Sequence, residues 1–402
     1  MDLTAPATGL QRYAIGGVVP RIAFTPATRA EAEAAMRDAA RQQLALVPWG
    51  GGIGLSRERA PERYDAVLDL SQLKRIVTFE PDDFTIRAEA GITIEELRAA
   101  LAEHNQELPL EAAEAWGATL GGALACNASG PRRLALGGPR DRLIGARFVT
   151  GTGESVQTGG RVVKNVAGYG THRMLCGSRG ALAVLLEASL KLLPRPLSRV
   201  ALVHGCDAAM LVDVALWAAF PRREPAVQTV LGRALAATNP VLASDAPFTV
   251  VTGFEEAVAW LEACAAFTRA TLGAPKLKLQ EASALTMWQV LCDAEEMPGA
   301  RLTFTTAHKT PAALAPIARE AVAERVLFHA PAGRLHVWPA AHEAAELATR
   351  LAAHGFALIE ARGCDVPLPA APRPVRELRA RIRGAIDPQG IFAFGTRWEA
   401  GR

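Results

Sequence analysis

Short apolar runs and a strong helical pattern alternate along the first part of the chain. Thr28 precedes an alanine-rich stretch that carries Glu31 in its first turn, which predicts a helix from Thr28 to about Gln42. The apolar runs are bounded by polar or turn-forming residues, and they predict strands near 21–24, 44–47, 66–70, 75–79 and 84–89. This order of elements is α+β rather than a regular βαβ repeat.

Two further patterns continue this region. The spacing of Thr93 and Glu96 forms a capping box, which predicts a helix that runs to about His104. A hairpin is expected over 145–158, and a long apolar stretch over 181–193 ends at the prolines that follow it.

Beyond Pro194-Arg195-Pro196 the chain has few glycine-rich loops. Helices are predicted near 207–219, 254–271, 311–323 and 341–353. Strands are predicted near 199–204, 247–252, 301–305, 326–329, 334–338 and 356–360. This pattern fits two helices over an antiparallel sheet, present once or in duplicate. The predicted division is a first domain over 1–196, a second over 197–370, and a C-terminal segment over 371–402 that opens with a basic helix.

Composition narrows the class of protein. Of 402 residues, 50% are hydrophobic and 21% are charged, which indicates a globular protein with a sizeable core and two domains. The net charge of +3 is small and scattered, which argues against nucleic-acid binding. The arginine-rich stretches 57–59 and 379–383 are interpreted as solvated faces.

The six cysteines form no C-x-x-C pair, which argues against a zinc or iron–sulfur site built from cysteines. Their wide spacing favours reduced thiols and a cytoplasmic location. No signal peptide and no membrane span are expected, because a basic leader and a long uncharged apolar stretch are both missing.

The segment 48–56, Pro-Trp-Gly-Gly-Gly-Ile-Gly-Leu-Ser, follows a predicted strand. Four glycines in five positions let backbone N–H groups close on a bulky anion such as a pyrophosphate. The spacing G-G-G-x-G is not the Rossmann G-x-G-x-x-G, and no Gly-Lys pair makes a P-loop. Taken alone, the loop predicts either an anion site or a flexible surface turn.

Two more small-residue runs, 118–130 and 159–169, share this half of the chain, and the second is followed by Gly177-Ser178-Arg179-Gly180. Three backbone-rich loops indicate a long ligand that lies across all of them. Together they resemble the FAD-binding domain of the vanillyl-alcohol oxidase type, over about 20–195 and again in the last twenty residues. The third run is most similar to its form in the FAD-binding subunits of bacterial glycolate oxidases.

The resemblance implies an α+β fold: a two-sub-domain FAD-binding domain with a second, antiparallel α+β cap domain. It also implies which residues lie along FAD. For the pyrophosphate these are Pro48, Trp49, Gly50, Gly51, Gly52, Ile53, Gly54 and Leu55. Beside the pyrophosphate and flavin they are Thr119, Gly121, Gly122, Ala125, Asn127 and Ser129. Beside the isoalloxazine and ribityl chain they are Gly160, Val162, Lys164, Asn165, Val166, Ala167, Gly168 and Tyr169. Near the adenine they are Gly180 and Leu185.

The chain departs from this family in three places. The first glycine loop contains no histidine, so FAD is expected to be bound non-covalently. Gly170-Thr171-His172 replaces the Asp-Leu that often follows the Gly-Tyr pair. Phe392-Ala393-Phe394-Gly395 replaces the usual Phe-Asn-Pro-Gly, so a polar contact to the flavin is missing.

Histidines are the candidate catalytic or metal-binding residues of the second domain. Related 2-hydroxyacid dehydrogenases carry a histidine-rich motif there, and its nearest counterpart is His329 and His336, seven positions apart. No Glu-His pair follows them, so no metal site is predicted. We expect one of the two to face solvent and the other to pack beside Trp338. His308 and His172 are isolated candidates, and the catalytic residues stay unknown.

The resemblance implies an FAD-binding subunit of a glycolate oxidase complex that carries or relays electrons from 2-hydroxyacid oxidation. The expected partners are a second flavin subunit and an iron–sulfur subunit. Two alternatives stay open. One is a free-standing FAD-dependent dehydrogenase of a small hydroxyacid or sugar lactone, and the other is a structural subunit with a vestigial flavin site. Any contact with the inner membrane is expected to be peripheral, through partner subunits.

Overall fold

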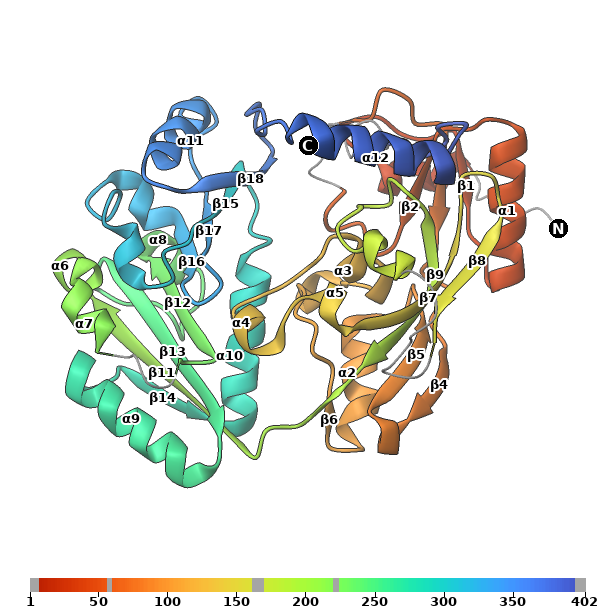
Figure 1. Ribbon diagram of the computed structural model, residues 1–402. Coiled ribbons are helices and arrows are strands. Elements are labelled where there is room, and N and C mark those ends of the chain that lie inside the picture. Colours follow the sequence, from red (N-terminus) through yellow and green to blue (C-terminus); the bar gives the residue numbers. More distant parts are fainter. Residues whose placement is uncertain (1–6, 56–59, 161–169, 220–223, 395–402) are drawn as a thin grey trace. The chain divides into compact units, whose positions relative to one another are not determined.

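The computed structural model describes residues 7–55, 60–160, 170–219 and 224–394. The chain divides into two compact units, each described here by itself (Figure 1). Unit 1 comprises Met1–Ala128, Gly137–Arg195 and Pro369–Arg402, and unit 2 comprises Ser129–Leu136 and Pro196–Leu368. The short segment Ser129–Leu136 groups with unit 2 although both of its flanks belong to unit 1, which the sequence pattern did not indicate. The predicted domain limits stay a prediction.

Unit 1 contains a parallel three-stranded sheet in the order β1 (Ile22–Phe24), β3 (Ala66–Asp69) and β2 (Leu46–Trp49). Helix α1 (Arg29–Arg41) forms as predicted, because the Thr28 side chain accepts a hydrogen bond from the backbone N–H of Glu31. Its alanine-rich face lies in one core cluster with residues of all three strands. Strand β2 begins two residues later than the sequence indicated.

The second sheet of unit 1 is antiparallel, and its five strands follow the order β4, β5, β9, β7 and β8. Their bounds are β4 Ile76–Glu80, β5 Thr85–Glu89, β9 Val184–Lys191, β7 Leu143–Val149 and β8 Ser155–Gly159. A small pair joins β6 (Gln106–Glu107) to β10 (Leu193–Pro194). The predicted hairpin is β7–β8, and the predicted capping box opens α2 (Ile94–Ala102), with Thr93 and Glu96 bonded reciprocally. The short helices are α3 Leu120–Ala125 and α5 Pro139–Arg142.

The C-terminal part of unit 1 returns to its N-terminal sheet. Helix α12 (Arg373–Ile386), blue in Figure 1, is followed by a segment that pairs with β2. The backbone N–H of Leu46 donates to the carbonyl of Ile391 (2.7 Å), and that of Ala393 donates to the carbonyl of Leu46 (3.1 Å). The turn after α12 is held by Asp387, whose carboxylate accepts from the backbone N–H of Ile391 (2.9 Å).

Unit 2 is built on an antiparallel sheet of eight strands, in the order β14, β11, β13, β12, β16, β17, β15 and β18. The bounds are β14 Leu277–Gln280, β11 Ser198–Cys206, β13 Phe248–Glu256, β12 Val227–Gly232, β16 Val326–His329, β17 Arg334–Val337, β15 Arg301–Thr305 and β18 Ala357–Arg362. Because side chains alternate along each strand, the sheet has two faces, and helices cover both.

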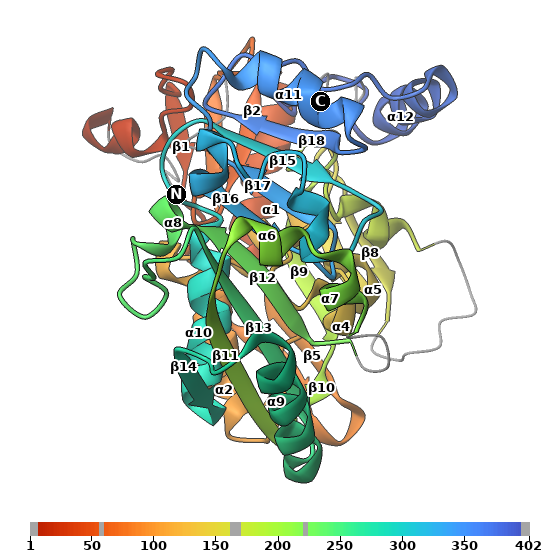
Figure 2. The same ribbon diagram turned by 90° about the vertical axis from the view of Figure 1, so that its left-hand side faces the viewer.

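Two long helices lie along β11 on opposite faces of this sheet (Figure 2). Helix α9 (Val258–Leu272) packs on Val200 and Leu202, whereas α10 (Glu281–Ala294) packs on Ala201 and Val203. The remaining helices of unit 2 are α4 Arg133–Leu136, α6 Ala208–Val212, α7 Val214–Ala218, α8 Arg233–Ala236 and α11 Ala344–Ala353.

The sequence pattern was wrong at several elements of unit 2. The helix predicted over 311–323 is replaced by two short 3-10 turns, Pro311–Leu314 and Ala321–Arg325. Pro316 lies between them, and a proline supplies no N–H for a helical bond. The helix predicted over 207–219 is divided at Asp213, and the one predicted from 254 begins at 258 because β13 continues to Glu256. Helix α10 and strands β12 and β14 were not predicted.

Candidate functional site

The predicted pyrophosphate loop packs closely against the start of α3. A Cβ on Gly50 would lie 2.3 Å from Thr119 Oγ1, and a Cβ on Gly51 would lie 2.2 Å from the carbonyl oxygen of Gly117. Both distances are far below any real contact, so only glycine allows this approach. The structure therefore brings the first two predicted FAD segments together, from positions almost seventy residues apart.

The segment 177–180, which follows the third run, joins them. Gly180 has a φ of +74°, which glycine adopts without strain, and a Cβ there would lie 3.1 Å from Pro48 Cγ. The backbone N–H of Arg179 donates to the carbonyl of Ala125 (2.9 Å). Gly180 therefore lies against the Pro48 ring and its neighbour Arg179 against Ala125, so segments predicted to lie along FAD meet within unit 1.

The small residues of α3 also serve a close approach. The backbone N–H of Gly121 donates to the carbonyl of Ala90 (2.7 Å), and a Cβ on Gly121 would lie 2.9 Å from Ala90 Cβ. Thr119 caps the helix through a hydrogen bond from the N–H of Gly122 (3.2 Å) to its side-chain oxygen. Leu185, in contrast, is buried in the core of the antiparallel sheet, so its side chain is a packing residue.

Part of the predicted FAD contact lies outside the described residues: Val162, Lys164, Asn165, Val166, Ala167, Gly168 and Tyr169. The described residue next to this stretch is Gly160, which with Gly159 and Thr158 lines a hollow of about 220 Å³ on the sheet. His172 is buried nearby, with its Nδ1 3.2 Å from Thr158 Oγ1. Burial lowers the pKa of His172, so this ring is neutral at pH 7.

Ser129, the last predicted residue of the second segment, belongs to unit 2. Its hydroxyl oxygen accepts a hydrogen bond from Arg334 Nη1 (2.9 Å). A few residues on, Arg132 is almost wholly buried and lies 2.9 Å from Glu255, which also pairs with Arg199 (2.8 Å). The segment 129–136 is thus tied to the sheet of unit 2 by ionic contacts.

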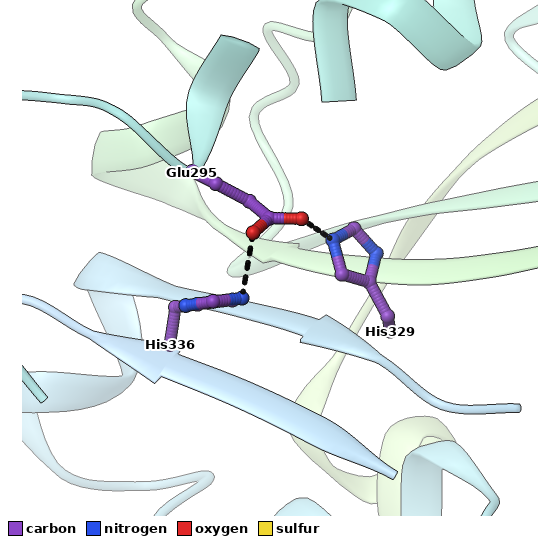
Figure 3. A group of neighbouring side chains, drawn as sticks. All are labelled: Glu295, His329 and His336. Atoms are coloured by element: carbon purple, nitrogen blue, oxygen red, sulfur yellow. Dashed lines mark hydrogen bonds and ion pairs between the residues drawn. The ribbon is translucent and has the colours of Figure 1, made fainter. Parts of the chain in front are cut away.

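A second group of candidate functional residues lies in unit 2, where Glu295 stands between His329 and His336 (Figure 3). Glu295 Oε1 is 3.1 Å from His329 Nε2, and Glu295 Oε2 is 3.3 Å from His336 Nε2. Glu295 directly follows α10, and the two histidines come from the adjacent strands β16 and β17. Both rings are fully buried.

Each histidine faces a buried threonine on a neighbouring strand. Thr229 is in register with His329, and their Oγ1 and Nδ1 atoms are 2.8 Å apart. Thr303 is in register with His336, and the corresponding distance is 3.1 Å. A threonine hydroxyl can either donate or accept, so it supports a histidine in either tautomer.

The charges of this cluster follow from burial and from its neighbours. Burial raises the pKa of the Glu295 carboxyl, but His336 and Arg334 outweigh burial and hold that pKa well below its usual range. Burial lowers the pKa of His336 to about 3, although Glu295 opposes this shift. The Arg334 guanidinium, 3.8 Å from the Glu295 carboxylate, favours the ionised form of this acid.

This set of donors is able to hold a metal ion. The three candidate ligand atoms lie within 4.8 Å of one another. Two imidazoles and one carboxylate are a ligand set that zinc uses when it keeps an open coordination position. The threonines would then accept from the histidine Nδ1–H groups and orient both rings.

The structure corrects one half of the prediction for these histidines, the solvent-facing ring, and confirms the other half, the packing beside Trp338. Neither ring faces solvent: both are fully buried, and His336 lies beside Trp338 with ring centroids 6.2 Å apart. The acidic partner lies upstream at Glu295, not downstream. One signal for it was present, because α10 has buried residues at the helical spacing 284, 287, 288, 291 and 292, and Glu295 is its C-cap.

Residues 20–159 match a family model described as an FAD binding domain. The chain is 42% identical over 137 residues to the glycolate oxidase subunit GlcE of Escherichia coli, a match that covers 34% of this chain and 39% of that protein. It is 34% identical over 179 residues to the D-2-hydroxyglutarate dehydrogenase of Xanthomonas citri, covering 44% of this chain and 38% of that protein. The chain thus spans about two fifths of the length of the curated relatives it matches.

The fold has a counterpart among solved structures. A structure of alkyldihydroxyacetonephosphate synthase matches with a TM-score of 0.68 at 17% identity, covering 96% of this chain and 79% of that chain. This confirms the predicted fold class, an FAD-binding α+β domain with a second antiparallel α+β domain, and the family match confirms FAD as the cofactor. Among the described residues, no helix combines the length and apolar character that crossing a membrane requires.

Proposed function

We propose that this chain is the FAD-binding subunit of a complex that oxidises a 2-hydroxyacid such as glycolate, because residues 20–159 match a family model described as an FAD binding domain. The observation that carries the proposal is the meeting of three glycine-dependent segments around Pro48, Gly51, Gly121 and Gly180. The similarity of the chain to a glycolate oxidase subunit and to a hydroxyglutarate dehydrogenase supports this substrate class.

In this proposal, the residues of unit 1 hold FAD without a covalent bond. Backbone N–H groups of Gly50, Gly51, Gly52 and Gly54 bind the pyrophosphate, because glycine leaves them accessible. No histidine is present in the loop to attach the flavin. The small residues of α3 and the segment ending at Gly180 line the rest of the cofactor. FAD, when bound, accepts the electrons of substrate oxidation.

Electron transfer beyond the flavin would require partners. None of the six cysteines forms a C-x-x-C pair, so this chain offers no iron–sulfur motif of its own. We therefore propose a second flavin subunit that meets the hydroxyacid and an iron–sulfur subunit that accepts electrons. The complex would be cytoplasmic, or peripheral at the inner membrane through those partners.

The Glu295 cluster favours a second candidate, a free-standing FAD-dependent dehydrogenase of a small hydroxyacid. Glu295, His329 and His336 could together hold a metal ion, and a bound cation would lower the pKa of a substrate hydroxyl, as oxidation of an alcohol requires. Arg334, with 22% of its side chain exposed, would attract the carboxylate of a hydroxyacid. In this reading the chain carries its own substrate site.

Reduction of the flavin separates these functions. The purified chain should be yellow, with the absorption bands of oxidised FAD, and a colourless, FAD-free preparation would exclude both readings. Glycolate, D-lactate and lactones are then added without oxygen. Bleaching of the isolated chain supports the free-standing dehydrogenase, and bleaching only with both partner subunits present supports the complex.

Two controls sharpen this experiment. In the free-standing dehydrogenase, His336→Asn should abolish bleaching while FAD stays bound, since His336 lies in the other unit from the FAD loops. In the complex, the same variant should bleach at the wild-type rate when the partners are present. If the chain binds FAD but the flavin is reduced neither in the isolated chain nor in the complex, the result supports the remaining alternative, a structural subunit with a vestigial flavin site.

A further inference from the structure

Helix α12 concentrates positive charge. Its 14 residues contain five arginines and one glutamate, a net charge of +4, whereas the whole chain carries +3. The glutamate, Glu377, already accepts a bond from Arg373 Nε (2.7 Å). Arg376 and Arg381 are exposed. The sequence alone favoured a solvated face here, but the structure adds a second property of the same helix.

That second property is an apolar stripe that continues past the core. Val375, Leu378, Ile382 and Ile386 follow one another at spacings of three and four, so they share one face of the helix. Ile382 and Ile386 are partly buried and pack against the core of the antiparallel sheet of unit 1. Val375 and Leu378 extend the stripe but are 39% and 54% exposed. One half of the stripe is docked, and the other half is open.

We propose that the first half of α12 is a docking helix for an acidic partner subunit. Val375 and Leu378 would enter an apolar groove of the partner as anchors three residues apart. Arg376 and Arg381 project on either side of the stripe and would meet carboxylates at the rim of that groove. The inference depends on the proposed complex, because the complex supplies the partner.

The small open apolar area favours a protein groove over a lipid surface, whereas the positive charge of α12 suits either one. Binding of an amphipathic helix to a membrane grows with the apolar area that it buries, and here only Val375 and Leu378 are available, since Ile382 and Ile386 already contact the core. Helix-in-groove recognition needs few anchors at spacings of three and four, and arginine is enriched at protein interfaces. The excess of arginine on α12 selects a partner of opposite charge.

The test uses the full chain co-expressed with the second flavin subunit and the iron–sulfur subunit. Its main readout is the affinity of the purified chain for the two partner subunits. Val375→Ser/Leu378→Ser should weaken binding by about tenfold or more, because both anchors lose their apolar contacts. The matched control is Val258→Ser on α9, which is 60% exposed in the free chain and should bind as wild type does.

The charge is tested separately. Arg376→Glu/Arg381→Glu should slow association and abolish its dependence on salt, whereas Arg319→Glu, an exposed arginine of unit 2, should do neither. Tight, salt-dependent binding by both double variants overturns the docking helix and leaves the complex standing. Failure of the wild-type chain to bind its partners overturns the complex, and the docking helix with it.

Two further results would also overturn the proposal. If Val375→Ser/Leu378→Ser lowers the Tm of the isolated chain as much as Ile382→Ser does, the open part of the stripe packs within the chain itself. If the wild-type chain binds vesicles of phosphatidylglycerol and the double variant does not, the helix docks on lipid. The proposal expects an unchanged Tm and no vesicle binding.

Discussion

Replacement of Gly51 by alanine is expected to separate two segments that hold FAD. The Cβ of the new alanine would lie 2.2 Å from the carbonyl oxygen of Gly117, whereas ordinary contact begins near 3.4 Å. The contacted atom belongs to the backbone and cannot rotate away, so the loop must move by about 1.2 Å. Such overpacking costs about 1–3 kcal/mol. We expect the apoprotein to relieve the clash by moving the loop and FAD binding to restore it, so that binding bears the cost. At 1.4 kcal/mol for each tenfold change in Kd, the affinity for FAD should then fall by about 5- to 140-fold.

The affinity is measured by titrating the apoprotein with FAD and following the quenching of flavin fluorescence. Circular dichroism establishes that the variant is folded. Gly384→Ala on α12 is the matched control, because a Cβ there would meet nothing within 4 Å; it should bind FAD as wild type does. Wild-type affinity in a folded Gly51→Ala variant would refute the idea that this close approach shapes the FAD site.

Three other perturbations test unit 2. Glu255→Ala removes the carboxylate that the buried Arg132 and Arg199 share, so the free energy of unfolding, measured in urea, should fall by about 3–5 kcal/mol. Glu256→Ala, at the exposed neighbouring position, is the control, and equal losses of stability in both variants would contradict the reasoning. Burial lowers the pKa of His204 below its usual value of 6.5 in the folded protein. Below pH 6.5 the unfolded chain therefore binds a proton at His204 that the folded protein does not. The free energy of unfolding falls by up to about 1.4 kcal/mol per pH unit until the pH reaches the lower folded-state pKa. His204→Phe should therefore flatten the decline in stability between pH 7.5 and pH 5.5, and an unchanged slope would count against the shift. Zn²⁺ added to chelator-treated wild-type protein should raise its Tm, and Glu295→Gln should require about 10–100-fold more Zn²⁺ for the same rise; equal responses would exclude Glu295 as a ligand.

The sequence by itself determined the features that depend on neighbouring residues. The cap at Thr28 and the capping box of Thr93 and Glu96 form as predicted, because each bonds groups only three residues apart. The glycine runs can also be interpreted from the sequence alone, because a backbone that approaches another segment closely has no room for a Cβ. From these runs the sequence led to the FAD-binding fold, which the comparisons confirm.

Only the tertiary structure decided which distant residues meet. Glu295 reaches His329 and His336 because α10 ends above two strands whose register places both rings on the same face. Arg132 meets Glu255 across 123 positions of sequence because residues 129–136 leave unit 1 for unit 2. The same holds for α12, where packing occupies Ile382 and Ile386 but leaves Val375 and Leu378 open. Spacing along a chain cannot specify such contacts, because register, the end of a helix and the face it buries are set only when the elements pack together.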